Sequence, residues 1–91
     1  MRKINWASKM KKDFNKVKRT VQNIESLLYP VIHDLAYDKV LPQKYRDHLL
    51  IGNWKGFRNC HIKSDLILVY RKQGEDTLEL ARLASHSELG F

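Results

Sequence analysis

The hydrophobic pattern of this chain changes its period once, near Leu41-Pro42, and this change limits the fold more than any other feature. Before it, Met10, Phe14 and Val17 recur as on one face of an amphipathic helix, and a second helical pattern follows. That second pattern is carried by Val21, Ile24, Leu28, Ile32 and Leu35. After it, three segments have strand character: Asn53 to Ile62, Leu66 to Lys72, and Thr77 to Leu83.

Turn residues separate the three strand-like segments. Ser64-Asp65 divides the first two, and Gln73-Gly74-Glu75-Asp76 divides the second from the third, which predicts an antiparallel meander. A short β-like stretch at Lys3 to Trp6 completes a β-α-α-β-β-β order. We therefore expect one α+β domain over residues 1–91, with two N-terminal helices on one face of a small, mainly antiparallel sheet and the other face free to bind a ligand.

Positive charge is concentrated at the N-terminus. The net charge is +7, and residues 1–20 hold eight Lys or Arg against Asp13 alone. Such a field favours polyanions or an acidic protein partner, although a lysine-rich helix face can also serve solubility alone. Two groups of basic residues are candidates for contact with RNA or the ribosome: Lys9, Lys11, Lys12, Lys16, Lys18 and Arg19 on the first helix, and Lys44, Arg46, Lys55 and Arg58.

The cysteine count and the apolar runs exclude several classes of protein. Cys60 is the only cysteine, so there is no internal disulfide framework. No apolar run approaches the roughly 18 residues of a membrane span, and charged residues interrupt the N-terminal segment where a signal peptide would need an apolar core. We expect a cytoplasmic protein.

A spaced set of ionisable residues in the second half carries the chemical signal. It consists of His48, His61, Asp65, Arg82 and His86. Cleavage of RNA without a metal needs a base for the 2′-hydroxyl, positive charge for the phosphorane-like transition state, and an acid for the 5′-oxygen, and histidine suits both proton transfers near pH 7. Zinc is the weaker alternative, because the paired short spacing of familiar zinc ligands is missing and Cys60 faces away from His61.

Arg82 is expected to end an apolar row, on the same strand face as Leu78 and Leu80. Such an arginine needs an anion. The candidates are a substrate phosphate or an internal carboxylate such as Asp47 or Asp65.

Four collinear motifs cover residues 41 to 91: YRDH ending at His48, GNWKGFRNCH ending at His61, DLILVY from Asp65 to Tyr70, and RLASH from Arg82 to His86. In this order they resemble the YafQ-type branch of the RelE/ParE toxin superfamily. The chain departs from that pattern in two places. Leu66 follows Asp65 where the family often has Trp, and Phe91 stands one residue later than the usual C-terminal aromatic.

The resemblance implies a bacterial toxin of a type II toxin-antitoxin pair, which cuts mRNA on the ribosome without metal or cofactor and is neutralised in a hetero-oligomer by its antitoxin. The five family positions are then His86 as general acid, His48 or His61 as general base, Asp65 as orienting group or proton acceptor, and Arg82 on the phosphate; Phe91 is a candidate for contact with RNA. A ParE-like toxin that binds DNA gyrase without catalysis is the alternative, and a plain nucleic-acid-binding module is a third.

Overall fold

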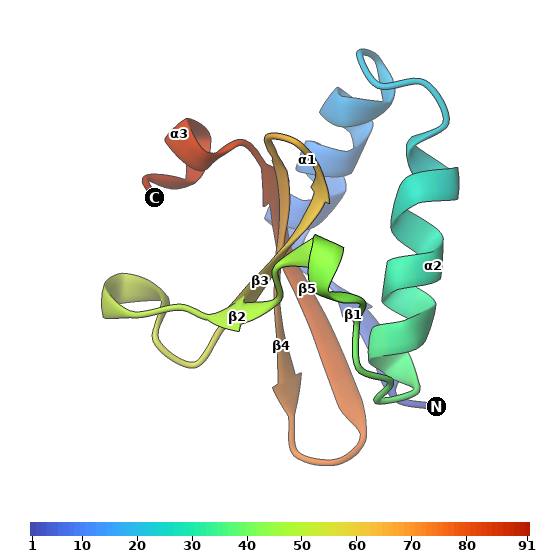
Figure 1. The fold of residues 1–91 in the computed structure, drawn as a ribbon, viewed down its shortest axis with the longest axis vertical. Helices are drawn as coiled ribbons and strands as arrows, with labels where there is room; N and C mark the ends of the chain where they lie inside the picture. The colour runs from blue at the N-terminus through green and yellow to red at the C-terminus, as the bar shows by residue number, and fades with distance from the viewer.

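The computed structural model, which describes residues 1–91, contains one five-stranded sheet (Figure 1). The strand order is β1-β5-β4-β3-β2, with β1 parallel to β5 and every other pair antiparallel. The strands are β1 Lys3–Trp6, β2 His48–Leu49, β3 Arg58–Lys63, β4 Leu66–Gln73 and β5 Thr77–Ala84.

Two helices cover one face of the sheet, α1 (Ser8–Lys18) and α2 (Ile24–Ala36). Figure 1 shows them on the same side, with the short C-terminal helix α3 (His86–Leu89) on the other. The main core between helices and sheet contains 17 buried residues, among them Leu28, Leu68 and Leu80. No helix has the length and apolar character that crossing a bilayer requires. The predicted α+β fold class, with two N-terminal helices on one face of a mainly antiparallel sheet, is confirmed.

The segment between α2 and the meander is more structured than predicted. It contains two 3-10 turns, η1 (Gln43–Tyr45) and η2 (Gly52–Trp54), and the two-residue strand β2. The first strand of the meander therefore begins at Arg58 rather than at Asn53, because the η2 turn and Gly56, with φ of +91°, break the extended backbone. Elements of two or three residues are too short to produce a hydrophobic period, which is why the pattern missed them.

The C-terminal helix was also not predicted. Ser85 caps it: its hydroxyl accepts a hydrogen bond from the backbone N–H of Glu88, while the Glu88 carboxylate accepts one from the backbone N–H of Ser85. Gly90 ends it in the left-handed conformation. One turn of helix shows no periodicity, but the Ser-x-x-Glu-x-Gly spacing is a local signal for it.

The sheet face opposite α1 and α2 is not entirely free. A second, smaller core on that face joins Ile67 and Val69 of β4 to Leu89 of α3, and Trp54 and Phe57 pack against it. All five residues from Leu66 to Tyr70 are buried, as expected of a strand covered on both faces. The expectation of an open second face is therefore wrong for the part under α3 and the β2–β3 loop.

The register between β4 and β5 shifts by one residue at Ala81, so that Arg82 pairs with Val69. A bulge of this kind interrupts the alternation of side chains between the two faces. Leu83, and not Arg82, therefore lies in the main core with Leu80. The prediction that Arg82 shares the face of Leu80 is wrong for this reason.

We expect Leu68→Ala to lower the free energy of unfolding by about 2–5 kcal/mol, because Leu68 is fully buried in the main core and its removal leaves a cavity. Urea denaturation followed by circular dichroism measures this change. Leu49→Ala is the matched control, since the Leu49 side chain is 62% exposed and its loss should cost less than about 0.5 kcal/mol. Equal costs at both positions would contradict the assigned core.

Candidate functional site

Three histidines meet on the sheet face opposite α1 and α2. His48 of β2 is paired with Asn59 of β3, and His61 follows two residues along β3, on the same face. His61 is paired with Ile67 of the second core. His86, the first residue of α3, brings its ring to a centroid distance of 5.1 Å from that of His61. The fold thus gathers residues that are 38 positions apart in the chain.

Asp65 holds His86 in place. One carboxylate oxygen accepts hydrogen bonds from the His86 backbone N–H at 3.1 Å and from its Nδ1 at 2.8 Å. These two bonds hold the pKa of Asp65 below its usual value. Because a carboxylate only accepts, Nδ1 carries a proton and Nε2 is left for another partner. Asp65 lies in the β3–β4 turn, so this contact also fixes α3 against the sheet.

His48 is oriented by the backbone. Its Nδ1 lies 2.7 Å from the carbonyl oxygen of Arg46, which can only accept, so Nδ1 is the protonated nitrogen and Nε2 carries the lone pair when the ring is neutral. Arg46 is left-handed, with φ of 50°, a conformation that is rare for a residue with a side chain. This conformation places the Arg46 carbonyl oxygen against the His48 ring.

The pKa of His61 is lowered from its usual value. Burial is the main cause, and the positive charges of His86, Arg46 and His48 add to it, while Asp65 acts weakly in the opposite direction. His61 is therefore neutral at pH 7. Protonation of His61 is less favourable in the folded protein than in the unfolded chain. This histidine therefore lowers the free energy of unfolding as the pH falls below about 6.5.

A groove of about 520 Å³ lies between α3 and the segment that leads from β2 to β3. We call it the histidine groove, and its walls include His48, Trp54, Asn59, His86 and Phe91. The Trp54 and Phe91 rings pack edge to face, with their centroids 6.1 Å apart. Asn59 is only 2% exposed, and its Oδ1 has no hydrogen-bond partner. The groove thus combines two histidines, an aromatic wall and an unpaired amide.

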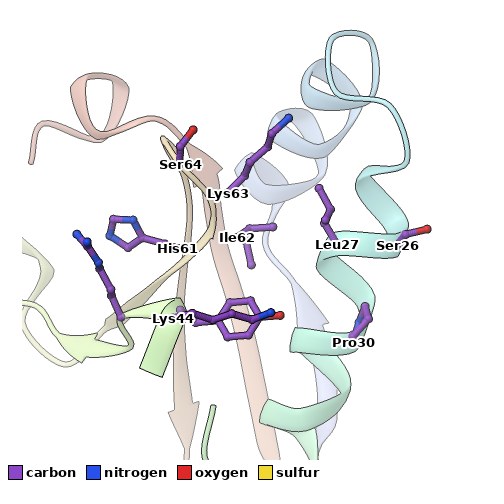
Figure 2. Close-up of a pocket in the computed structure, with 10 residues that line it drawn as sticks. Ser26, Leu27, Pro30, Lys44, His61, Ile62, Lys63 and Ser64 are labelled. Atoms are coloured by element: carbon purple, nitrogen blue, oxygen red, sulfur yellow. The ribbon is translucent and has the colours of Figure 1, made fainter. Parts of the chain in front are cut away.

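A second hollow, of about 500 Å³, lies between α2 and the end of β3 (Figure 2). Lys44, Arg46 and Lys63 line it, no carboxylate does, and none of the three is in an ion pair. In Figure 2 the imidazole of His61 points away from α2, whereas Ile62 points toward it. His61 is also one of the residues that line this basic cleft, so the cleft adjoins the histidine cluster.

Arg82 is not part of the histidine cluster. Its guanidinium donates hydrogen bonds to the carboxylate of Asp13, from Nε at 2.7 Å and from Nη2 at 3.3 Å, and Asp13 also accepts one from the Leu83 backbone N–H. The expected internal partners, Asp47 and Asp65, bond elsewhere: Asp47 to Tyr70 and Arg58, and Asp65 to His86. The internal carboxylate is therefore Asp13, whose signal was its position as the one acid in a basic helix.

The basic candidates for RNA contact are mostly free. Lys16 and Arg58 differ from the others, because they form ion pairs with Glu88 and Asp47. The Lys16 hydrogen bond, together with those from Ser85, lowers the pKa of Glu88 to about 2. The remaining predicted residues are exposed and without an ion pair: Lys9, Lys11, Lys12, Lys18, Arg19, Lys44, Arg46 and Lys55.

No three His, Cys, Asp or Glu side chains are grouped so that they could hold a metal ion.

Sequence reasoning missed Asn59 as a site residue, although it precedes His61 by two positions and strand alternation puts both on one face. It also treated Trp54 as a packing residue, whereas Trp54 both packs on the second core and lines the histidine groove.

A family model described as the bacterial toxin YafQ of type II toxin-antitoxin systems matches residues 2–90. The chain belongs to the YafQ toxin family. This confirms the resemblance inferred from the four motifs, and the match extends over the N-terminal helices as well as the residues that carry those motifs.

Individual relatives agree with this assignment. The chain is 31% identical over 88 residues to the mRNA interferase toxin YafQ of Escherichia coli K12, covering 97% of this chain and 95% of the relative. A copper-bound mutant toxin from Helicobacter pylori has the same fold, with a TM-score of 0.90 and 44% identity over 98% of this chain and 99% of that one. The E. coli DinJ-YafQ complex contains a chain with a TM-score of 0.81 and 29% identity, at 98% coverage of both chains.

We expect an NMR titration of the His61 ring to give a midpoint below 6.5. Arg46→Gln should raise this midpoint, because one of the positive charges that disfavour protonation is removed. Lys3→Gln removes the same charge at β1, on the opposite edge of the sheet, and should leave the midpoint unchanged. A wild-type midpoint at or above 6.5 would contradict the electrostatics described for the cluster.

We expect Arg82→Ala to lower the free energy of unfolding by about 1–3 kcal/mol, the range for losing a hydrogen bond to a charged group that is mostly buried. The Arg82 and Asp13 side chains are only 21% and 15% exposed. Urea denaturation measures the change, and Arg46→Ala, which removes an exposed arginine without an ion pair, is the control. Unchanged stability of Arg82→Ala would show that the pair with Asp13 does not hold α1 to β5.

Proposed function

We propose that this protein is a toxin that cleaves mRNA on the ribosome by metal-independent acid-base catalysis. The observation that carries the proposal is the meeting of His48, His61 and His86, in which two rings have Nδ1 bound to an acceptor and Nε2 free. Side chains fixed in this way are prepared for proton transfer. A binding-only toxin of the ParE kind has no chemical need for this arrangement.

The reaction is an attack of the 2′-hydroxyl oxygen on the adjacent phosphorus. A base removes the 2′-proton, the new P–O2′ bond forms, the P–O5′ bond breaks, and an acid protonates the departing 5′-oxygen. The products are a 2′,3′-cyclic phosphate and a 5′-hydroxyl. The attacking and leaving oxygens lie on opposite sides of phosphorus, so the acid and the base must act from opposite sides of the phosphate.

His48 is the base and His86 the acid in this proposal. Both line the histidine groove, on β2 and α3 respectively, whereas His61 lies beside His86 and so on the side of the acid. The Asp65 carboxylate accepts a hydrogen bond from Nδ1 and so fixes the His86 ring, which leaves Nε2 available to a substrate. His61 is neutral and can donate a hydrogen bond to a phosphate oxygen.

Positive charge for the transition state comes first from Arg46, since its charge acts on His61 and it has no carboxylate partner. Arg82 is one of the five family positions, but its guanidinium is bound to Asp13. To contact a substrate phosphate directly, Arg82 would have to leave Asp13 and bind the phosphate instead. We assign Arg82 to holding α1 on β5 and, through that exchange, to a secondary role on RNA.

The partners follow from the relatives and from charge. The E. coli relative is named an mRNA interferase, and another E. coli YafQ chain is found in a complex with DinJ. We propose that this chain likewise binds a cognate antitoxin in a hetero-oligomer, and that α1 and the basic cleft bind ribosomal RNA through their lysines. Phe91, at the end of the histidine groove, is proposed to contact mRNA.

The test is mRNA cleavage in a cell-free translation reaction, with 5′ ends mapped by primer extension. We expect the wild type to cut translated mRNA at codon-phased positions, and His86→Gln and His48→Gln to reduce the rate by at least about 100-fold, as general acid-base catalysis contributes. His33→Gln is the matched control, because His33 is exposed on α2 and lies away from the groove.

Intact mRNA with folded wild-type protein would overturn the nuclease assignment and favour the alternative, inhibition of DNA gyrase by binding. Cleavage that persists in His86→Gln would retain the activity but reject this histidine cluster as its site.

A further inference from the structure

We infer that the histidine groove is a nucleobase site and that Asn59 recognises the edge of the base bound there. The inference rests on the proposed RNA cleavage and names the part of the substrate that this groove takes: the base of the nucleotide that carries the reacting phosphate. Nothing in the catalytic assignment requires Asn59, which transfers no proton.

Asn59 is the one buried polar residue of the chain. Its side chain is 2% exposed, forms none of the side-chain hydrogen bonds of the fold, and leaves Oδ1 without a partner. Buried amides are almost always paired, because an unpaired one costs free energy that an apolar residue of similar size would avoid. An unpaired amide in the wall of a groove indicates that its partner is a ligand.

The amide is suited to a base edge because it is not held in one orientation. Rotation by half a turn exchanges Nδ2 and Oδ1, which have nearly the same shape, so Asn59 can present a donor or an acceptor to the groove. A nucleobase edge offers a donor and an acceptor side by side, and asparagine forms paired hydrogen bonds with such edges.

The rest of the groove has the properties of a base pocket. Trp54 and Phe91 supply aromatic surface on which a base can stack, and Leu50 and Leu89 supply apolar surface. The volume of about 520 Å³ is within the range of small-molecule sites. No Asp or Glu side chain lines the groove to repel the phosphate of a bound nucleotide.

The position of Asn59 connects base binding to catalysis. It lies directly opposite His48 in the β2–β3 register, and His86 lines the same groove. A base held against Asn59 therefore brings its own ribose and phosphate to the two histidines proposed as base and acid. Base binding would orient the 2′-hydroxyl, and the identity of the bound base would set the sequence preference of cleavage.

The decisive variant is Asn59→Leu, which has a similar volume and no polar atoms. If Asn59 recognises a base, cleavage in the translation assay should fall by at least about tenfold, the effect of one lost hydrogen bond, while the melting temperature stays equal or rises because no polar atom is left unpaired. Asn59→Asp, which accepts but does not donate, should shift cleavage toward sites with an amino-bearing base. Asn5→Leu on β1 is the matched control at the far edge of the sheet.

A second measurement does not depend on cleavage. Nucleoside 5′-monophosphates are titrated into the ¹⁵N-labelled full chain, and the Asn59 side-chain N–H signals are compared with those of Asn5. Chemical-shift changes confined to the Asn59 signals support the inference. They test it independently if Asn59→Leu does not fold.

Wild-type cleavage and sequence preference in a folded Asn59→Leu, or no shift of the Asn59 signals with any of the four nucleotides, would overturn the inference. Absence of cleavage by the wild type would instead contradict the proposed function, and the nucleotide titration would still report on the groove.

Discussion

The structure depends on the burial of both faces of β4. Every residue from Leu66 to Tyr70 is buried, and the Tyr70 hydroxyl is the only polar side-chain group among them. Helices α1 and α2 cover one face of this strand, so a second layer is needed on the other face. That layer is α3 with Leu89, together with the β2–β3 loop with Trp54 and Phe57. Because the layer is small, it leaves a groove at its margin, and the three histidines stand at that margin. The site is thus a consequence of how the second core is completed.

Charged side chains attach the peripheral elements to this sheet. Beyond Trp6, β1 no longer pairs with β5, and Asp13 of α1 instead binds the Leu83 backbone N–H and the Arg82 guanidinium there. Asp65 binds two nitrogens of His86 and so holds the start of α3. The Arg82–Asp13 pair is largely shielded from water, the situation in which a hydrogen-bonded ion pair contributes measurably to stability, whereas the Asp65–His86 contact is exposed. They also determine which groups remain free for a substrate: Arg46 is free, whereas Arg82 is already paired.

The electrostatics of the cluster suit one division of roles among chemically identical side chains. His61 is disfavoured as a cation by burial and by its neighbours, while His86 has a carboxylate on Nδ1 and His48 a carbonyl. The proposed division of roles rests on these different surroundings. Membership of the YafQ family is consistent with such a site. The groove beside it, with an unpaired Asn59 and an aromatic wall, extends the same argument from proton transfer to the recognition of a base.

The sequence by itself determined the order of the main elements, the α+β class and the family, because the change of hydrophobic period and the four motifs are local properties of the chain. It also singled out His48, His61, Asp65 and His86, which the fold brings to one face.

Tertiary structure alone decided the partner of Arg82, because a one-residue bulge at Ala81 reverses the alternation that strand periodicity assumes. It alone decided that Asn59 is buried and unpaired, since the burial of a polar residue depends on contacts between β2, β3 and α3 that are distant in sequence. Residue type and spacing predict which chemistry is available, and packing decides which groups are left unpaired to perform it.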